Sequence, residues 1–338
     1  MPENSNEKKI YHTIDDIAKE LGVSKTTVSR AISGKGRMSA KTREKILNFI
    51  EECNYRPNAV AQSLARNCTF NLGLVLPEDY MEADMPFFQK YMKGVCEEAA
   101  DHNYDILVTV AGNDSITALE RIIDYHKVDG IITSRSTENS AVISCLKEKN
   151  IPFVVAGYHP DPEVVYCDHD TKEACCNLIT LLIAKGMKKM ALFGRSESHY
   201  VDKSRLSGFE KACRQTGVSF EDQLVFWNLS DNEKISKALD VVEKSDVDVI
   251  VCMDDYICNI TFLQMRERNI VVPQDIKIVS LYDSIILQNS MPSITSLRFD
   301  AIKLGKTACK MLLSMLSGEK VESSVFPEYQ MILRDSTK

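Results

Sequence analysis

The sequence lacks the long apolar run of a membrane-spanning helix, because no stretch approaches the roughly 20 apolar residues that a bilayer requires. Its N-terminal residues also lack the apolar core of a signal peptide. Eleven cysteines are present, but no two are spaced as Cys-x-x-Cys, and most, including Cys96 and Cys213, lie in apolar periodic stretches. We interpret them as small buried hydrophobic residues in a reducing compartment. We therefore expect a cytoplasmic protein without a membrane partner.

Patterns for nucleotide phosphate chemistry and for catalysis are also absent. The chain contains neither a Walker motif nor a strand-linked Gly-x-Gly-x-x-Gly. No nucleophile is placed with a base and an orienting group, and no carboxylate pair has a defined geometry, so we expect no enzymatic activity. The run Cys167-Asp168-His169-Asp170 contains residue types that bind metals, but it lacks ligand spacing and a second ligand group. We predict no metal and no cofactor.

Charge is unevenly distributed along the chain. The first 70 residues carry 12 Lys and Arg against 8 Asp and Glu, whereas the remainder carries 29 against 40, which gives the net charge of −7. A basic N-terminal segment on an acidic chain favours contact with DNA through that segment only, because the acidic remainder repels phosphate. Charge alone is weak evidence, and the spacing of residues is stronger.

Two short amphipathic helices joined by one glycine are predicted between residues 13 and 33. The first has an apolar stripe at i, i+3, i+4 and i+7, formed by Ile14, Ile17, Ala18 and Leu21. Thr13 and Asp16 are spaced as its capping box, Gly22 supplies a positive-φ turn, and Ser24 is the N-cap of the second helix. The second helix turns Val28, Ala31 and Ile32 inward; its outward face consists of Lys25, Thr26, Ser29 and Arg30. Such a pair is a helix-turn-helix or, alternatively, any small helical hairpin with a solvated face.

A third helix and a short apolar segment follow. Ser39 is the expected N-cap of a helix that is buried through Ile46, Ile50 and Cys53. The run Tyr55-Arg56-Pro57-Asn58 ends this helix and begins the apolar residues 59–65.

These residues, from Thr13 to Ala65, resemble the DNA-binding headpiece of the lac repressor (LacI-type) family of bacterial transcriptional regulators. The resemblance includes Gly-Val-Ser-x-x-Thr-Val-Ser-Arg at 22–30 and Asn-Tyr-x-Pro-Asn-x-x-Ala-x-x-Leu at 54–64. It implies that Lys25 and Thr26 read bases and that Ser29 and Arg30 contact phosphate and base. It also implies a hinge helix over 58–65, of which Leu64 wedges into the minor groove, unless that leucine packs on the adjoining domain. The expected DNA contacts are Thr13, Ser24, Lys25, Thr26, Thr27, Ser29 and Arg30, together with Asn58, Ala61 and Leu64 of the hinge helix.

From Asn71 onward, short aliphatic runs alternate with helical stretches, which is typical of a parallel sheet covered by helices. The predicted strands are 72–76, 106–110, 130–133 and 152–155, and then 190–193, 224–227, 249–252 and 276–281. The repetition predicts two doubly wound α/β subdomains. Ligands in this architecture bind in the cleft where the C-terminal strand ends meet.

This region resembles the effector domain of the same family, which is itself similar to periplasmic sugar-binding proteins. The matching segments are 168–175, expected to begin a linking helix, and 185–191, 205–209, 272–276, 292–296 and 333–337. The resemblance implies a headpiece at 1–57, a hinge helix and linker at 58–69, and an effector-binding and dimerisation domain at 70–338. The two subdomains of that domain are expected at roughly 70–168 plus 298–326, and at 169–297 plus 327–338.

The resemblance also implies which residues contact the effector. Arg205 matches an arginine that forks onto effector hydroxyls or a carboxylate, a task suited to a planar donor, unless it is a surface residue. Phe87 and Phe88 match aromatic positions at which a ring stacks on the ligand, although they fit the core equally well. Asp254 matches a polar effector contact, and Trp227 lies near an aromatic pocket position.

One position departs from the family pattern. The family has Gly-Tyr/Phe-Asp-Asp where this chain has Ser280-Leu281-Tyr282-Asp283, so Tyr282 replaces a common acceptor for sugar hydroxyls. A phenol makes fewer bonds and carries no charge near neutral pH. A simple sugar is therefore in doubt, and the alternatives are a more aromatic, phosphorylated or anionic ligand, or a pocket that no longer binds small molecules.

Taken together, these features predict a sequence-specific transcriptional regulator, a repressor, that binds near-palindromic duplex DNA as a homodimer under control of a small-molecule effector. An effector-dependent activator, a regulator that requires a co-repressor, and a receptor without DNA function are the alternatives. A protein co-regulator has no support in the sequence. The chain ends at Lys338 without leucine heptads, so we expect a dimer and no tetramerising tail.

Overall fold

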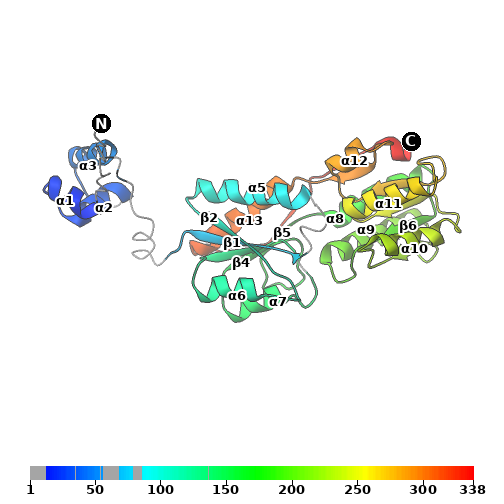
Figure 1. Ribbon diagram of the computed structural model, residues 1–338, viewed down its shortest axis with the longest axis horizontal. Helices are drawn as coiled ribbons and strands as arrows, with labels where there is room; N and C mark the ends of the chain where they lie inside the picture. Colours follow the sequence, from blue (N-terminus) through cyan, green and yellow to red (C-terminus); the bar gives the residue numbers. More distant parts are fainter. Residues whose placement is uncertain (1–12, 35, 54, 56–67, 79–85, 136) are drawn as a thin grey trace, which may run out of the picture. The chain divides into compact units, whose positions relative to one another are not determined.

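The chain divides into two units, residues 1–69 and 70–338 (Figure 1). The computed structural model describes residues 13–34, 36–53, 55, 68–78, 86–135 and 137–338. Within this described part, no helix has the length and apolar character needed to span a bilayer.

The N-terminal unit contains three helices, α1 (Ile14–Glu20), α2 (Lys25–Ser33) and α3 (Ala40–Glu52). Both hydrogen bonds of the predicted capping box are present between Thr13 and Asp16, and Ser24 caps α2 as expected. Gly22 has a φ of +67°, which a residue with a side chain adopts at a cost. The three helices enclose a small core formed by Ile17, Ala18, Val28, Ala31 and Ile46. The predicted helix-turn-helix is therefore confirmed. Asn58, Ala61 and Leu64 lie outside the described residues.

The second unit contains two six-stranded sheets. The first has the strand order β11-β5-β4-β3-β1-β2, and all its pairs are parallel. Its strands are β1 (Asn71–Leu76), β2 (Asp105–Val110), β3 (Gly130–Thr133), β4 (Phe153–Ala156), β5 (Tyr166–His169) and β11 (Ser324–Phe326). One face packs on α5 (Pro86–Asp101) and α13 (Ala301–Leu316), and the other on α6 (Thr117–Asp124) and α7 (Ala141–Glu148).

The second sheet has the order β12-β10-β9-β8-β6-β7. Its strands are β6 (Met190–Phe193), β7 (Leu224–Phe226), β8 (Val249–Cys252), β9 (Lys277–Ser280), β10 (Thr295–Arg298) and β12 (Gln330–Ile332), of which β12 alone is antiparallel among the described strands of this sheet. The helices are α8 (Thr171–Ala184) and α9 (Tyr200–Thr216) on one face, and α10 (Asn232–Val242) and α11 (Asp255–Glu267) on the other. The short α12 (Ile285–Asn289) and the 3-10 helix η2 (Asp335–Thr337) complete this subdomain. The predicted doubly wound α/β fold is confirmed.

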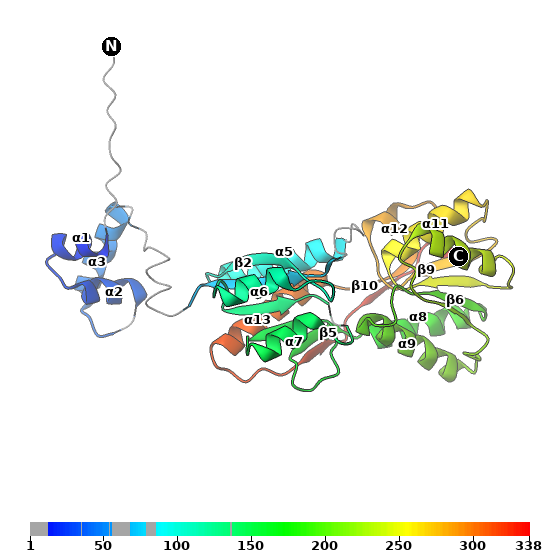
Figure 2. The ribbon, with the colours of Figure 1, turned by 60° about the horizontal axis from the view of Figure 1, so that its bottom comes forward.

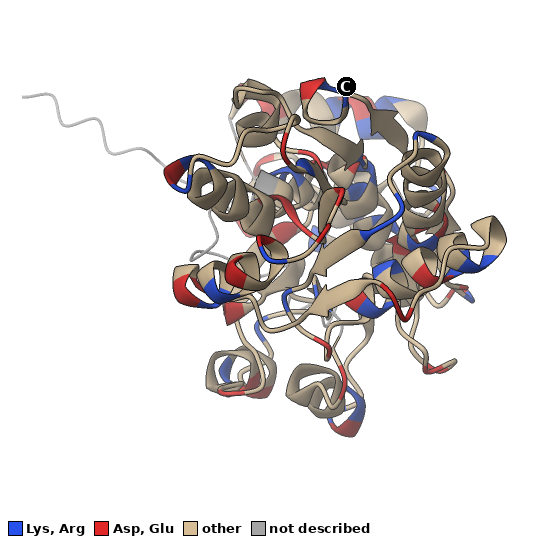
Figure 3. Ribbon diagram, turned by 90° about the vertical axis from the view of Figure 1, so that its right-hand side faces the viewer, with Lys and Arg blue, Asp and Glu red and all other residues tan. Residues whose placement is uncertain are grey.

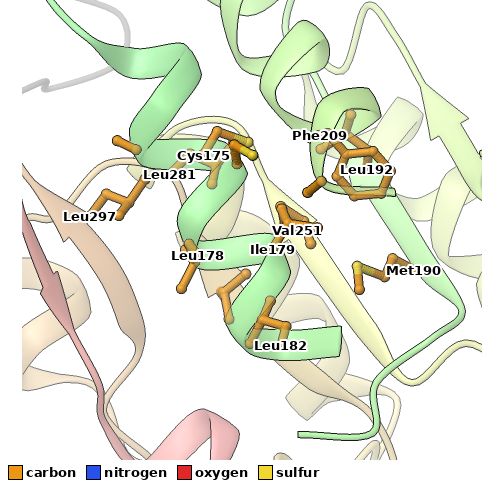
Figure 4. Packing of buried hydrophobic residues seen from close by; sticks show 14 of the residues in the cluster. Cys175, Leu178, Ile179, Leu182, Met190, Leu192, Phe209, Val251, Leu281 and Leu297 are labelled. Atoms are coloured by element: carbon orange, nitrogen blue, oxygen red, sulfur yellow. The ribbon is translucent and has the colours of Figure 1, made fainter. Parts of the chain in front are cut away.

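The core beneath α8 and α9 holds the second subdomain together. Figure 4 shows Cys175, Leu178, Ile179 and Leu182 of α8 beside Met190 and Leu192 of β6, Phe209 of α9 and Val251 of β8. Eight of the eleven cysteines are buried, as predicted from their apolar surroundings. Cys96 is an exception, because its position on α5 faces solvent.

The chain crosses between the subdomains after β5, after β10 and after β11 (Figure 2). Asp168 belongs to β5, so the expectation that it begins the linking helix is wrong; α8 begins at Thr171, with Asp170 as its N-cap. The strands of each subdomain end at the boundary between the two, which places the loops that follow them around a common cleft.

Candidate functional sites

The first candidate site is the outward face of α2. Lys25, Thr26, Ser29 and Arg30 are all exposed, whereas Val28 and Ala31 on the opposite side are buried. The helix has no acidic residue in its first turn, so its positive N-terminal end is not neutralised from within the helix. This is the geometry required of a helix whose N-terminal half enters a major groove.

Two of the residues predicted at the DNA, Thr13 and Ser24, also serve as helix caps. The Ser24 hydroxyl accepts a hydrogen bond from the Thr27 backbone N–H at 3.1 Å and lies 2.8 Å from the Thr27 hydroxyl. The Thr13 hydroxyl donates to Asp16 at 2.7 Å. Lys25 forms an ion pair with Asp15 of α1, and both side chains are solvent-exposed. Since an exposed ion pair contributes about 1 kcal/mol or less, Lys25 can exchange this partner for a base or a phosphate at little cost.

The second candidate site is the cleft between the subdomains of residues 70–338. Five of the six residues predicted to bind the effector line it, namely Phe87, Phe88, Arg205, Asp254 and Tyr282. They share the wall with side chains that the sequence did not single out for a ligand, among them Tyr158, Asp168, His169, Arg195, Asp202, Asp255 and Phe299. Most of these residues lie at or just after the carboxyl end of a strand, which is the position that this architecture gives to ligand contacts.

Trp227 does not line the cleft. Its indole packs against Gly194 so closely that a Cβ on that glycine would lie 2.4 Å from the ring. It also contacts the core shared by α8 and α9. The structure therefore gives Trp227 a packing role within the second subdomain, and we do not retain it among the effector contacts.

Arg205 is the centre of the cleft's charge distribution. It projects from α9, is buried, and lies 3.5 Å from Asp202 through its Nη1 atom. Its Nε atom has no hydrogen-bond partner among the described residues. The side chain is therefore held in place while one donor is left for a ligand.

Three buried carboxyls surround this arginine. Asp168 comes from β5, Asp202 from α9 and Asp255 from the first turn of α11. Burial raises the pKa of each of them to about 6, and the positive charge of Arg205 opposes the rise in all three cases. Asp168 accepts hydrogen bonds from the backbone N–H groups of Tyr158 and His169, at 2.9 and 2.8 Å. These carboxyls are thus held in low-dielectric surroundings with limited compensation.

Asp254 is engaged by the protein itself. One carboxylate oxygen accepts from the backbone N–H of Ile257 at 2.7 Å and so caps α11; the other lies 3.1 Å from Nε of Arg195. The Arg195 guanidinium in turn lies 4.9 Å from the centre of the Tyr256 ring. Asp254 thus positions Arg195, whereas its neighbour Asp255, like Asp168, has no ion-pair partner among the described residues.

Aromatic rings form the apolar part of the wall. Tyr282 stacks on Phe299 with ring centres 6.4 Å apart and meets Phe87 edge-on at 5.7 Å. Burial raises the pKa of Tyr282 well above its ordinary value, so its phenol stays protonated. Phe88 is buried in the core of the first subdomain, whereas Phe87 is only partly buried and contacts both cores. The structure thus supports both interpretations of this pair, as part of the core and as part of the cleft wall.

His169, at the end of β5, faces the same cavity. Its ring lies against Phe299 and Phe326, with centres 5.1 and 5.7 Å away. Burial lowers the pKa of His169 to about 4, against an opposing effect of Asp300, so the imidazole is neutral. Apart from the backbone of Asp300, neither ring nitrogen has a hydrogen-bond partner among the described residues. Among the described residues, no group of three or more metal-binding side chains could hold a metal ion.

Contacts across the mouth of the cleft join the two subdomains. The Glu138 N–H donates to the Ser198 carbonyl at 3.0 Å, and the Glu138 carboxylate forms an ion pair with Lys203 of α9. The Tyr200 ring meets that of Tyr158 edge-on at 6.2 Å. We refer to the Glu138–Lys203 pair and the Glu138–Ser198 bond as the latch.

Comparison with known proteins finds a family model that matches each of the two units. Residues 13–58 match the model of the bacterial regulatory proteins of the lacI family, and residues 179–337 match that of the periplasmic binding protein-like domain. The HTH-type transcriptional regulator MalR of Staphylococcus xylosus is 29% identical over 314 residues, which cover 91% of this chain and 93% of MalR.

Two solved structures have the same fold over nearly the whole chain. The lac repressor dimer bound to operator and the anti-inducer ONPF has a TM-score of 0.78 at 20% identity, covering 97% of this chain and 99% of that one. The complex of the transcriptional regulator CelR with cellobiose has a TM-score of 0.72 at 23% identity, covering 96% and 99%.

Proposed function

Because the chain belongs to the lacI family of bacterial regulatory proteins and is a transcriptional regulator, we propose that it is a repressor that binds a near-palindromic operator as a homodimer. We further propose that a small molecule in the cleft controls its affinity for DNA. The observation that carries the proposal is the exposed polar face of α2, opposite an apolar face on which Val28 and Ala31 are buried.

Lys25 and Thr26 are the proposed base readers, since they lie in the first turn of α2. Ser29 and Arg30 lie one turn further on, where they would reach phosphate and the next base. The acidic second unit would add little affinity for phosphate, because Lys and Arg are interspersed with Asp and Glu over its helices (Figure 3). Specific binding would therefore depend on the N-terminal unit.

Selection from random duplex DNA at about 150 mM salt tests this proposal, because non-specific binding is weak under these conditions. We expect a short near-palindrome to be enriched. Lys25→Ala should relax the base preference by at least about fivefold at one position of each half-site. Lys237→Ala, which removes an exposed lysine from α10, is the matched control and should leave the selected sequence unchanged. If no sequence is enriched, the alternatives are a receptor without DNA function or a regulator that requires a co-regulator.

A second copy of this chain is the partner proposed for two exposed apolar patches. One patch lies at α12 and consists of Ile285, Ile286 and the 87% exposed Met291; the other lies on the edge strand β2 and consists of Val108 and Val110. Exposed apolar groups of this kind are costly in a monomer, and a two-fold contact would cover the same patches on both copies. The solved relative bound to operator is itself a dimer.

Light scattering during size-exclusion chromatography measures the mass of the protein and so tests whether it is a dimer. Ile285→Glu should shift the mass toward the monomer, because it places a charge in the proposed contact. Val241→Glu is the matched control, since it changes an exposed apolar residue of α10 outside both patches. Equal masses for the two variants would contradict this assignment of the interface.

The cleft is the proposed effector site, and the latch is the proposed element that responds to the effector. A ligand that binds better when the latch is formed shifts the population toward that arrangement, typically with about 1–3 kcal/mol of coupling to the DNA site. Coupling is tested by measuring affinity for the selected operator with and without the ligand. An unaltered operator affinity at saturating ligand would refute the coupling.

A further inference from the structure

Four aspartates and three arginines line the cleft, namely Asp168, Asp202, Asp254 and Asp255 with Arg135, Arg195 and Arg205, so the described lining has one negative charge in excess. Arg205 lies nearest Asp202 at 3.5 Å, and Arg195 pairs with Asp254 at 3.1 Å. Among the described residues, Asp168 and Asp255 form no ion pair, although each lines the cavity and is at most 8% exposed. Arg205 acts on both carboxylates from a distance, but neither has an ion-pair contact, which is costly in a buried site, so a cation supplied from outside would be bound favourably at these two groups.

Two further side chains indicate that a ligand completes this cavity. His169 is 6% exposed and Arg205 is 7% exposed, and both line the cavity. Among the described residues, the Nε atom of Arg205 has no hydrogen-bond partner, and the ring nitrogens of His169 have none apart from the backbone of Asp300. Buried polar atoms are normally satisfied, so each of these is an opening for a ligand atom. Arg205 requires an oxygen acceptor, because a guanidinium only donates.

We propose that the effector carries a protonated amine, balanced by Asp168 and Asp255, and beside it an oxygen that accepts a hydrogen bond from Nε of Arg205. This inference rests on the proposed effector function of the cleft and adds the chemical class of the ligand. The rings of Tyr282 and Phe87 complete the site with an apolar wall over which a cation is also attracted.

The same charges disfavour the other classes of ligand. A phosphorylated or otherwise anionic compound would face Asp168 and Asp255 as well as Arg205, so the repulsion would offset what the guanidinium contributes. Asp254, which the family resemblance places at the ligand, is already engaged by Ile257 and Arg195. A neutral sugar would leave both carboxylates without an ion-pair contact.

The amine can belong to an amino sugar or to an amino acid, because both have an oxygen acceptor next to the ammonium group. Thermal unfolding of the full chain would therefore be followed with two matched pairs of probes at about 10 mM and equal ionic strength. The pairs are glucosamine with N-acetylglucosamine, and phenylalanine with N-acetylphenylalanine. Acetylation removes the positive charge in each pair and keeps most of the remaining structure.

At least one free amine should raise the unfolding temperature while its acetylated partner does not. Asp168→Asn and Asp255→Asn should each weaken the binding of that amine at least tenfold by titration calorimetry. Asp222→Asn, which changes an exposed carboxylate away from the cavity, is the control and should leave its affinity unchanged. Folding of each variant is checked independently by its unfolding transition without ligand.

Stabilisation by an acetylated probe equal to that by the free amine would overturn the proposal, as would unchanged affinity in both cleft variants. Failure of both amines to stabilise the protein would also count against it. Selection of an operator from random DNA is independent of these probes. A selected operator without an amine response refutes the ligand class alone, whereas failure to select an operator refutes the regulatory function.

Discussion

Replacing Asp255 with asparagine should stabilise the unliganded protein near neutral pH. Burial raises the pKa of this carboxyl from 3.8 to about 6, with the charge of Asp254 adding to the rise. A difference of about 2 pKa units corresponds to about 3 kcal/mol of destabilisation once the group is ionised in both states. This shift is already net of the attraction to Arg205, and asparagine still buries a polar side chain, so about 3 kcal/mol is an upper limit on the gain.

The sign of the pH dependence follows from the proton that the folded protein retains. Between about pH 4 and 6 the folded protein keeps the proton of Asp255 and the unfolded chain has lost it, so the stability contributed by the protonated carboxyl falls as pH rises through this window. Burial also acts on Asp283, but hydrogen bonds from Arg334 and Ser296 lower its pKa, and its contribution is lost as pH falls. Because Asp283 is present in both proteins, its contribution cancels when the stability of Asp255→Asn is compared with that of the wild type.

Thermal unfolding at several pH values measures this difference. We expect the two proteins to melt together near pH 4 and the variant to melt several degrees higher above pH 7, by at most about 10 °C. Asp254→Asn is the control, because it keeps an N-cap for α11 but weakens the pair with Arg195, and should lower the melting temperature. The reasoning is refuted if Asp255→Asn melts at or below the wild-type temperature at about pH 7.5.

Two other substitutions test the packing and the latch. Gly94→Ala would place a Cβ 2.2 Å from the backbone oxygen of Ile302, so α5 and α13 must separate. We expect the free energy of unfolding, measured with denaturant, to fall by about 1–3 kcal/mol. An unchanged unfolding midpoint would contradict the close approach of these helices. Lys203→Met removes the ion pair that Lys203 forms with Glu138 in the latch. Because exposed ion pairs contribute about 1 kcal/mol or less, this substitution should weaken binding of the stabilising amine by at most about fivefold in calorimetry. Lys211→Met is its control, because Lys211 pairs within the second subdomain, and equal effects of the two substitutions would exclude the latch.

The fold could be predicted where local sequence signals coincide with structure. The capping box at Thr13 and the N-cap at Ser24 are local patterns, and the aliphatic strands β1 and β6 are short buried runs. Strands β5, β10, β11 and β12 were missed, because they are three or four residues long and carry polar side chains such as Asp168. Their pairing joins segments far apart in the chain, a non-local property that periodicity does not reveal.

The candidate site was only partly predictable for a related reason. Arg205 and Tyr282 were found through their resemblance to family positions, and both line the cleft. Asp202 and Asp255 were not found, because a single aspartate in a helix has no distinctive sequence pattern. Their importance arises from burial around one guanidinium, which only the folded chain brings together. Trp227 was included because an aromatic residue was expected nearby, and its packing on Gly194 removes it.

Tyr282 offers a final test of why this cleft differs from the family pattern. Tyr282→Phe keeps the stacking on Phe299 and the edge contact with Phe87, so the protein should remain folded and lose only the contacts of the hydroxyl group. Tyr282→Asp restores the acidic residue of the family but adds a carboxylate to a cavity in which Asp168 and Asp255 already lack ion pairs. We therefore expect Tyr282→Asp to melt well below Tyr282→Asn near neutral pH and to approach it near pH 4, where carboxyls are protonated, because both variants lose the ring and only one carries a carboxyl. A Tyr282→Asp variant as stable as Tyr282→Asn near neutral pH would show that the cleft tolerates further negative charge, and the charge argument for an amine ligand would then fail.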